Sequence, residues 1–267
     1  MDLGLTEKCA LLIGAGRGLG GAAAISLARE HARVAMVART REDVEARARE
    51  CLAAGAADAI GIAADATDPA QLDAAIESTA SRFGGIDVLV TLVGGSQPGG
   101  TAELSEPDWP AAYERNLWPA VRASRSALPY LAQSAVRRGF PEKPREASVI
   151  LHVASIWGRE GGGALSYNTA KAALIALAHE QARELAPRGV RVLSLAPGSI
   201  LHAGGSWERR QKEDPAAIAA FVKREIPFGR FGMAEEIGDT IAFLVSTRAS
   251  WIAGACVVVD GAQSRSF

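Results

Sequence analysis

The stretch Lys8-Cys9-Ala10-Leu11-Leu12-Ile13-Gly14-Ala15-Gly16-Arg17-Gly18-Leu19-Gly20-Gly21 decides how the rest of the sequence is interpreted. Residues 8–13 are mostly apolar and end in glycine, as is typical of a buried parallel strand. A helical pattern follows at 22–30. Between a strand and a helix, glycines let a phosphate approach the backbone, where free N–H groups and the helix dipole favour an anion. This order predicts a phosphate site, although the glycines alone also fit a merely tight turn.

Strand-like and helix-like segments alternate along the whole chain. Helical patterns at about 41–54, 69–83, 108–137, 167–186 and 234–246 separate apolar runs that we interpret as strands, at 34–38, 59–64, 86–93, 148–154, 190–196 and 255–261. This alternation specifies a parallel sheet with helices on both faces. We find no repeats and no second core, so we expect one α/β domain over residues 1–267.

Composition and charge exclude several classes of protein. The 267 residues carry 29 Lys and Arg against 30 Asp and Glu, without a basic patch, so we expect no nucleic-acid partner. No run of 18 apolar residues occurs, so we expect no membrane partner, and residues 1–4 do not resemble a secretory signal. The three cysteines lie far apart, which favours reduced, mostly buried thiols. We therefore predict a cytoplasmic protein.

The predicted strand ends identify one edge of the sheet as the binding site. Ligands of such sheets bind outside the carboxyl ends of the strands, where the strand order reverses. Gly14, Ala38, Asp65 and Gly94 mark the carboxyl ends of four of the strands. Asp65 can reach an adenine amino group there, whereas Asp68 is interpreted as a helix cap.

Arginines near the second strand favour NADP(H) over NAD(H). An acid at the end of this strand would bind the adenosine ribose, whereas arginine accommodates a 2′-phosphate. Here Ala38 removes any acid, Arg39 supplies a cation, and Arg17 of the glycine turn can flank the same phosphate. The alternative is that both arginines are simply solvated.

Tyr167 and Lys171 are the candidate proton-transfer pair. Residues four apart share one helix face, and an ammonium beside a phenol is expected to lower the phenol's pKa. Such a tyrosine can exchange a proton with a substrate oxygen near neutral pH. Ser155, twelve residues upstream at a strand end, can hydrogen-bond that oxygen. The alternative is a solvated helix face.

Other features of the sequence carry weaker predictions. Trp118-Pro119 predicts a kink near Asn116 in a helix at 108–137, although Asn116 also fits an ordinary helix residue. Residues 199–227 form a polar, mostly helical insert, a candidate lid or substrate loop. Trp157 and Trp207 either line a substrate pocket or serve packing or an oligomer interface. We interpret His152 as structural and 137–147 as an exposed loop.

Taken together, the sequence closely resembles the short-chain dehydrogenase/reductase family, in its ketoacyl-reductase-like branch, over essentially its whole length. The resemblance is carried by the glycine turn, the strand ends and the candidate catalytic residues: Gly14, Gly18, Gly20, Asp65, Asn116, Ser155, Tyr167, Lys171, Pro197 and Gly198. Residues 228–232, 235–237 and 259–261 match as well. The resemblance implies a doubly wound, seven-stranded parallel sheet with helices on both faces (a Rossmann fold) and a bound nicotinamide dinucleotide.

The resemblance also implies residue roles. Tyr167 would be the general acid/base and Ser155 the donor to the carbonyl oxygen. Lys171 would lower the tyrosine pKa and bond the nicotinamide ribose, and Asn116 would hold a relay water. The implied cofactor residues are Gly14, Gly16, Arg17, Gly18, Leu19, Gly20, Ala38, Arg39, Thr40, Asp65, Ala66, Gly94, Tyr167, Lys171, Pro197, Gly198 and Ile200. Family members are usually homotetramers or homodimers, built through the helices that carry Asn116 and Tyr167 and through the last strand and helix.

Three positions depart from the family pattern. Ile13 stands where a threonine usually precedes the first glycine. The run Thr91-Leu92-Val93-Gly94 replaces Asn-Asn-Ala-Gly and loses a side chain that normally braces the sheet. Leu201-His202 stands where a threonine often bonds the carboxamide. None of the three removes a catalytic group.

These observations predict an NADP(H)-dependent oxidoreductase that interconverts a ketone and a secondary alcohol, with Tyr167 as general acid/base. The partner is a small carbonyl or alcohol substrate, and we expect no metal. Two alternatives remain. One is a reductase of a C=N or conjugated C=C bond in a tailoring pathway, and the other is a non-catalytic dinucleotide-binding protein.

Overall fold

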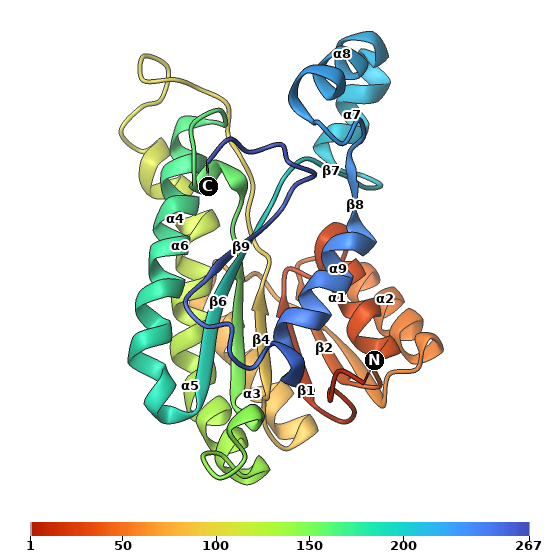
Figure 1. The fold of residues 1–267 in the computed structure, drawn as a ribbon, viewed down its shortest axis with the longest axis vertical. Coiled ribbons are helices and arrows are strands. Elements are labelled where there is room, and N and C mark those ends of the chain that lie inside the picture. Colours follow the sequence, from red (N-terminus) through yellow and green to blue (C-terminus); the bar gives the residue numbers. More distant parts are fainter. Residues whose placement is uncertain (1, 267) are drawn as a thin grey trace.

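A parallel sheet of seven strands forms the centre of the molecule (Figure 1). In the computed structural model, which describes residues 2–266, the strand order is β3-β2-β1-β4-β5-β6-β9. The strands are β1 (Cys9–Ile13), β2 (Arg33–Ala38), β3 (Asp58–Ala63), β4 (Val88–Thr91), β5 (Ser148–Val153), β6 (Val190–Pro197) and β9 (Cys256–Val259). The order reverses between β1 and β4, so the predicted fold class is confirmed and the switch point lies beside the glycine turn.

Helices cover both faces of the sheet because alternate residues of each strand point to opposite sides. In β1, Ala10 and Leu12 belong to one core cluster, whereas Leu11 and Ile13 belong to the other. The first cluster packs against α1 (Gly18–Arg29), α2 (Arg41–Ala54) and α9 (Ala234–Val245). The second packs against α3 (Pro69–Phe83), α5 (Trp118–Arg138) and α6 (Leu165–Leu185). No helix between residues 2 and 266 has the length and apolarity that a membrane span requires.

Close packing of α1 on the glycine turn requires a glycine at position 20. A Cβ added to Gly20 would lie 2.3 Å from the carbonyl oxygen of Gly14, far inside van der Waals contact. The absent side chain lets α1 begin directly against the turn, so its N-terminus points along the carboxyl edge of the sheet.

The helix predicted at 108–137 divides into two. Helix α4 (Asp108–Asn116) ends at Leu117, and α5 begins at Trp118 with the buried Pro119 in its first turn. Proline lacks the N–H that would continue the bonding of α4, so the predicted kink at Asn116 is confirmed. Further along α5, Pro129 is accommodated inside the helix.

The insert predicted at 199–227 is helical and carries its own small core. It contains β7 (Ile200–Leu201), α7 (Ser206–Glu213) and α8 (Pro215–Glu225), and β8 (Gly232–Met233) closes it by pairing with β7. Four short 3-10 helices complete the structure: η1 (Pro144–Glu146), η2 (Ile156–Gly158), η3 (Ala186–Arg188) and η4 (Thr247–Ala249). Figure 1 shows the insert and the loop before α4 at the same end of the molecule, above the carboxyl ends of the strands.

A buried hydrogen-bonded chain braces the centre of the sheet. Thr91 Oγ1 and His152 Nδ1 lie 2.8 Å apart on the paired strands β4 and β5, and His152 Nε2 lies 3.0 Å from Gln181 Oε1 on α6. His152 is fully buried, and this burial lowers its pKa to about 4. His152 is therefore structural, as predicted, and Thr91 takes part in bracing the sheet where the family pattern has asparagine.

We predict that His152 makes stability depend on pH. The unfolded chain protonates this imidazole near pH 6.5, whereas the folded protein keeps it neutral down to about pH 4. Stability is therefore lost as pH falls through this window, by about 3 kcal/mol in total. His152→Gln should unfold more easily at pH 7.5, and its deficit should shrink towards pH 4.5 as the wild type loses this contribution.

Urea denaturation at several pH values measures this deficit. The control is His179→Gln, which changes an exposed histidine and should give a small deficit. A His152→Gln deficit that stays constant from pH 7.5 to 4.5 would contradict the prediction.

Candidate active site

A cleft of about 590 Å³ follows the carboxyl edge of the sheet around the switch point. Its walls come from the glycine turn, from the ends of β2, β3 and β4, and from α4. Nine of the predicted cofactor residues line it: Gly14, Gly16, Arg17, Ala38, Arg39, Thr40, Asp65, Ala66 and Gly94. The structure therefore brings together residues that are up to 80 positions apart in the sequence.

The glycine turn presents uncapped N–H groups near this cleft. No side chain caps the N-terminus of α1, whose N-cap residue is Arg17. The first N–H groups of a helix have no partner within the helix, and here Gly18, Leu19 and Gly20 carry them. Gly14 adopts a positive φ of 93°, which a residue with a side chain rarely adopts. The arrangement has the form of an anion site and fits a dinucleotide diphosphate.

The two arginines predicted to select NADP(H) differ in their surroundings. Arg17 Nε lies 2.9 Å from Asp43 Oδ2, in an exposed ion pair with the first turn of α2. Arg39 is exposed and lines the cleft, and no hydrogen bond or ion pair of its side chain occurs among residues 2–266. Asp43 was missed by the sequence reasoning, although an acid four residues after Arg39, in the first turn of the next helix, was a visible signal.

Asp65 is held by its own loop. One carboxylate oxygen accepts hydrogen bonds from the backbone N–H of Thr67, at 2.9 Å, and from its hydroxyl, at 2.8 Å. These bonds lower the pKa of Asp65, so the side chain is charged at neutral pH. Asp68 caps α3 as predicted, accepting from the N–H groups of Ala70 and Gln71.

Ser155 and Tyr167 meet beyond the end of β5. Ser155 lies two residues after the end of that strand and is buried, and its Oγ accepts a hydrogen bond from the backbone N–H of Trp157 at 3.2 Å. Tyr167 lies in the first turn of α6. Burial raises the pKa of the Tyr167 phenol, and a hydrogen bond with Ser155 acts in the opposite direction.

Lys171 is buried one helical turn from Tyr167. Its Nζ donates to the carbonyl oxygens of Val153, at 3.0 Å, and Val93, at 3.4 Å. Burial lowers the pKa of Lys171 to about 8. The ammonium lies 5.7 Å from the centre of the Tyr167 ring. The pair therefore shares one helix face, as predicted. The prediction that Lys171 lowers the Tyr167 pKa is wrong for this structure. Burial of the phenol raises that pKa, and the Lys171 ammonium donates to main-chain carbonyls.

Asn116 links the end of α4 to the segment after β4. Its Oδ1 accepts from the backbone N–H of Gly95, and its Nδ2 donates to the carbonyl oxygens of Gly95 and Ala112, all at 2.9–3.0 Å. A Cβ on Gly94 would lie 2.8 Å from Asn116 Oδ1 and 3.0 Å from Lys171 Nζ. Asn116 and Lys171 thus flank the same glycine, which has no room for a side chain.

Trp157 and Trp207 both pack within their own segments. Trp157 lies against the glycines of the loop between Ser155 and Tyr167, since a Cβ on Gly162 would meet its ring at 2.4 Å. Trp207 stacks on Phe221, with ring centres 4.6 Å apart, and contacts Phe231 at 5.1 Å. These contacts favour the packing interpretation for both tryptophans.

The segment after β6 completes the edge. Pro197 ends the strand, the N–H of Gly198 donates to the carbonyl oxygen of Val259 on β9, and Ile200 is buried. His202 lies against the glycine turn, since a Cβ on Gly18 would be 2.9 Å from its ring. This contact joins residues far apart in the sequence and was not predicted.

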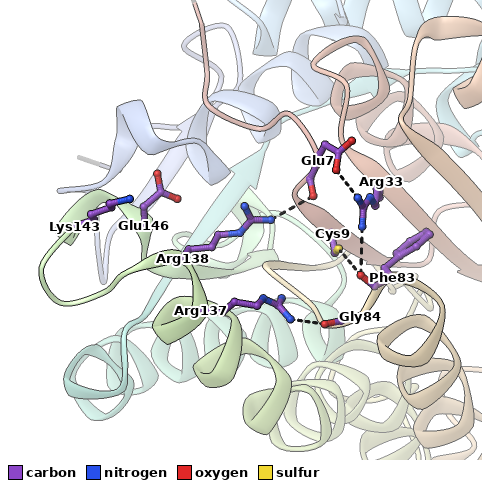
Figure 2. Close-up of a pocket in the computed structure, with 9 residues that line it drawn as sticks. All are labelled: Glu7, Cys9, Arg33, Phe83, Gly84, Arg137, Arg138, Lys143 and Glu146. Atoms are coloured by element: carbon purple, nitrogen blue, oxygen red, sulfur yellow. Dashed lines mark hydrogen bonds and ion pairs between the residues drawn. The ribbon is translucent and has the colours of Figure 1, made fainter.

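A second cavity, of about 620 Å³, lies at the opposite end of the sheet (Figure 2). Figure 2 shows Arg33, Arg137 and Arg138 around it. Its charges are largely paired: Arg33 with Glu7, Arg138 with Asp87, and Glu146 with Lys8 at 2.9 Å. The loop at 137–147 therefore helps to close the base of the sheet. Among residues 2–266, no cluster of three or more His, Cys, Asp or Glu side chains is arranged to hold a metal ion.

Comparisons with known proteins agree with this geometry. The family model described as enoyl-(acyl carrier protein) reductase matches residues 14–262. The 3-oxoacyl-(acyl-carrier-protein) reductase FabG of Escherichia coli (strain K12) is 32% identical over 255 residues, covering 95% of this chain and 96% of that protein. The reductase of the same name from Staphylococcus aureus (strain N315) is 31% identical over 260 residues, covering 95% and 97%.

Solved structures show the same fold over the whole chain. L-sorbose reductase from Gluconobacter frateurii, complexed with NADPH and L-sorbose, superposes with a TM-score of 0.89 at 28% identity and covers 100% of both chains. A 7α-hydroxysteroid dehydrogenase complexed with NADH and 7-oxo glycochenodeoxycholic acid gives 0.87 at 26% identity, covering 99% of this chain and 97% of that one. The chain therefore belongs to the short-chain dehydrogenase/reductase family of oxidoreductases, in its ketoacyl-reductase-like branch.

Proposed function

We propose that this protein is an NADP(H)-dependent oxidoreductase that interconverts a ketone and a secondary alcohol. The observation that carries the proposal is the grouping of Ser155, Tyr167 and Lys171 at the carboxyl edge of the sheet, on the same edge as an uncapped glycine turn. A dinucleotide bound along this edge would supply or accept the hydride.

The side chains of this chain would handle the substrate oxygen. In the direction of reduction, the Tyr167 phenol donates its proton to the oxygen as negative charge develops there, and the Ser155 hydroxyl donates a hydrogen bond to the same oxygen. A raised pKa keeps the phenol protonated at neutral pH, as a proton donor must be. The Lys171 ammonium, one helical turn away, stabilises the phenolate left after the transfer.

Asn116 and Lys171 connect this site to the supply of protons. Both have polar atoms close to Gly94. A water held between these groups would return a proton to Tyr167 after each turnover, which is the relay role that we propose for Asn116. Lys171 would also bond the nicotinamide ribose, with Pro197, Gly198 and Ile200 around the nicotinamide.

NADP(H) is the cofactor that the exposed cations favour. The Arg39 guanidinium, just after β2, has no hydrogen bond or ion pair within the part of the chain that the structure describes, and Ala38 offers no carboxylate to bind a ribose hydroxyl. Thr40 lies beside Arg39, and the NADPH complex of L-sorbose reductase supports the same choice. The ion pair of Arg17 with Asp43 weakens the contribution of Arg17.

A second candidate is reduction of a conjugated C=C bond. The description of the matching family model, an enoyl reductase, favours it, whereas the matching 3-oxoacyl reductases favour a carbonyl substrate. The hydroxyls of Ser155 and Tyr167 lie within hydrogen-bonding reach of each other, so both can donate to one substrate oxygen, and we place carbonyl reduction first.

We also propose a homotetramer or homodimer, and we retain the cytoplasmic location as a prediction. Support for the oligomer comes from the half-buried edge strand β9 and from apolar side chains near it. Trp251 is 97% exposed and Phe243 is 40% exposed. We infer that a second copy of the chain covers these two aromatic side chains.

We predict that Tyr167→Phe lowers kcat for NADPH-dependent ketone reduction at least about 100-fold, because the proton donor is lost. The Kd for NADPH, measured by fluorescence, should stay within about twofold, since the ring keeps its packing. The matched control is Tyr130→Phe, a half-buried tyrosine on α5, which should keep full activity. A Tyr167→Phe protein that retains most of its turnover would rule out the assignment.

We predict that Arg39→Ala weakens NADPH binding about tenfold and leaves NADH binding unchanged. The reason is the loss of a charge-assisted bond to the 2′-phosphate. Arg17→Ala should have a smaller effect because Asp43 already pairs with that guanidinium. Arg29→Ala, at the far end of α1, is the control. Equal losses for NADPH and NADH in the Arg39 variant, or a wild-type preference for NADH, would contradict this prediction.

A further inference from the structure

The segment 260–266 follows β9 and crosses the carboxyl edge of the sheet. We call this segment the strap. Figure 1 shows it running from the end of β9 towards β7 and then back towards α6. The chain reverses at Gly261 and Ala262, which both have positive φ values. The Asp260 carboxylate holds this reversal by accepting from the N–H groups of Ala262, at 2.9 Å, and Ser264, at 2.7 Å.

One contact of the strap is with the segment after β6. Gln263 is 8% exposed, its Oε1 accepts from the backbone N–H of Ser199 at 2.7 Å, and its Nε2 donates to Ser199 Oγ at 3.0 Å. The fit is tight, because a Cβ on Gly198 would lie 2.8 Å from Gln263 Oε1. Ser199 belongs to the segment that we propose surrounds the nicotinamide.

A second contact is with the loop between Ser155 and Tyr167. Glu160 Oε2 accepts from the backbone N–H groups of Arg265 and Ser266, both at 2.8 Å. The carbonyl oxygen of Glu160 in turn accepts from Asn168 Nδ2 at 3.3 Å, one residue after Tyr167. The strap is therefore bonded to the loop that joins Ser155 to Tyr167.

The third contact reaches the helical insert. The N–H of Phe228 donates to the carbonyl oxygen of Gly261 at 3.3 Å, just after α8. Three segments from different parts of the sequence thus converge on one stretch of seven residues. Each of them borders the proposed site.

We propose that Gln263 and Glu160 are positioning residues: through the strap, they fix the nicotinamide segment and the catalytic loop relative to each other. This inference rests on the proposed function. Hydride and proton transfer need donor and acceptor aligned within a fraction of an ångström, and a small misplacement costs rate steeply. The nicotinamide segment follows β6 and the catalytic loop follows β5. The strap hydrogen-bonds to both of them at the edge of the sheet where the reaction would occur.

The first test compares variants of Glu160. Glu160→Ala removes the acceptor of both strap N–H groups and should lower kcat about five- to twentyfold, with the Kd for NADPH within about twofold. Glu160→Gln keeps an amide oxygen at the same place and should restore most of the activity. The control is Glu142→Ala, an exposed glutamate in the loop at the opposite end of the sheet. Equal kcat in wild type and Glu160→Ala would overturn the role of Glu160.

The second test compares Gln263→Ala with Gln263→Glu and uses Gln133→Ala, an exposed position on α5, as its control. Loss of both bonds to Ser199 should raise the Kd for NADPH about fivefold. Amide hydrogen exchange should become faster in peptides covering both 197–201 and 156–164. Gln263→Glu keeps an acceptor for the Ser199 N–H and should fall between wild type and Gln263→Ala.

Exchange that becomes faster only at 197–201, with the catalytic loop unchanged, would contradict the proposed coupling. This readout also separates the two proposals. A wild type that binds NADPH but reduces no carbonyl compound would overturn the proposed function, whereas hydrogen exchange and NADPH affinity would still decide whether the strap couples the two segments.

Discussion

The buried ammonium of Lys171 is the interaction on which the site depends. It donates to the main-chain carbonyl of the last residue of β5 and to one just after β4, so a helix side chain ties α6 to the two central strands. Its lowered pKa, about 8, corresponds to a cost of about 3 kcal/mol for holding the charge in this surrounding. The rest of the core offsets that cost. The hydrogen bonds of Lys171 hold α6 against the sheet, so that Tyr167, one turn earlier on α6, has a fixed position beyond the end of β5.

Other buried polar side chains at and below this edge are also fixed by hydrogen bonds within the protein. Asn116 is the last residue of α4, next to the proline-containing first turn of α5. Its side-chain amide hydrogen-bonds the backbone N–H and carbonyl of Gly95. His152 stays neutral and joins Thr91 to Gln181 below the site. Buried polar groups of this kind are costly unless each is bonded, so they allow one arrangement of strands and helices and few others. The rigid edge that results can hold a dinucleotide and a substrate oxygen in register.

The sequence predicted the fold, and it named residues that the structure brings to one edge of the sheet, because both follow from local patterns. Apolar runs located the strands, and the proline after Asn116 located the break between α4 and α5. The predicted lowering of the Tyr167 pKa was wrong. The burial of the phenol and the hydrogen bonds of Lys171 to main-chain carbonyls arise only when α6 packs on the sheet, so no local pattern indicates them. The bond from Gln263 to Ser199 joins positions 64 apart and has no local signature.

The central claim is that a hydride moves from a nicotinamide to a carbonyl carbon at this edge. The most direct measurement uses NADPH carrying deuterium at the transferable position, a panel of ketones and 3-oxoacyl thioesters, and matched enones and imines. Mass spectrometry of the products locates the label. We predict that each ketone that is reduced gives an alcohol with one deuterium on its carbinol carbon. Label found only on the former C=C or C=N carbon, or NADPH binding without label in any product, would contradict it.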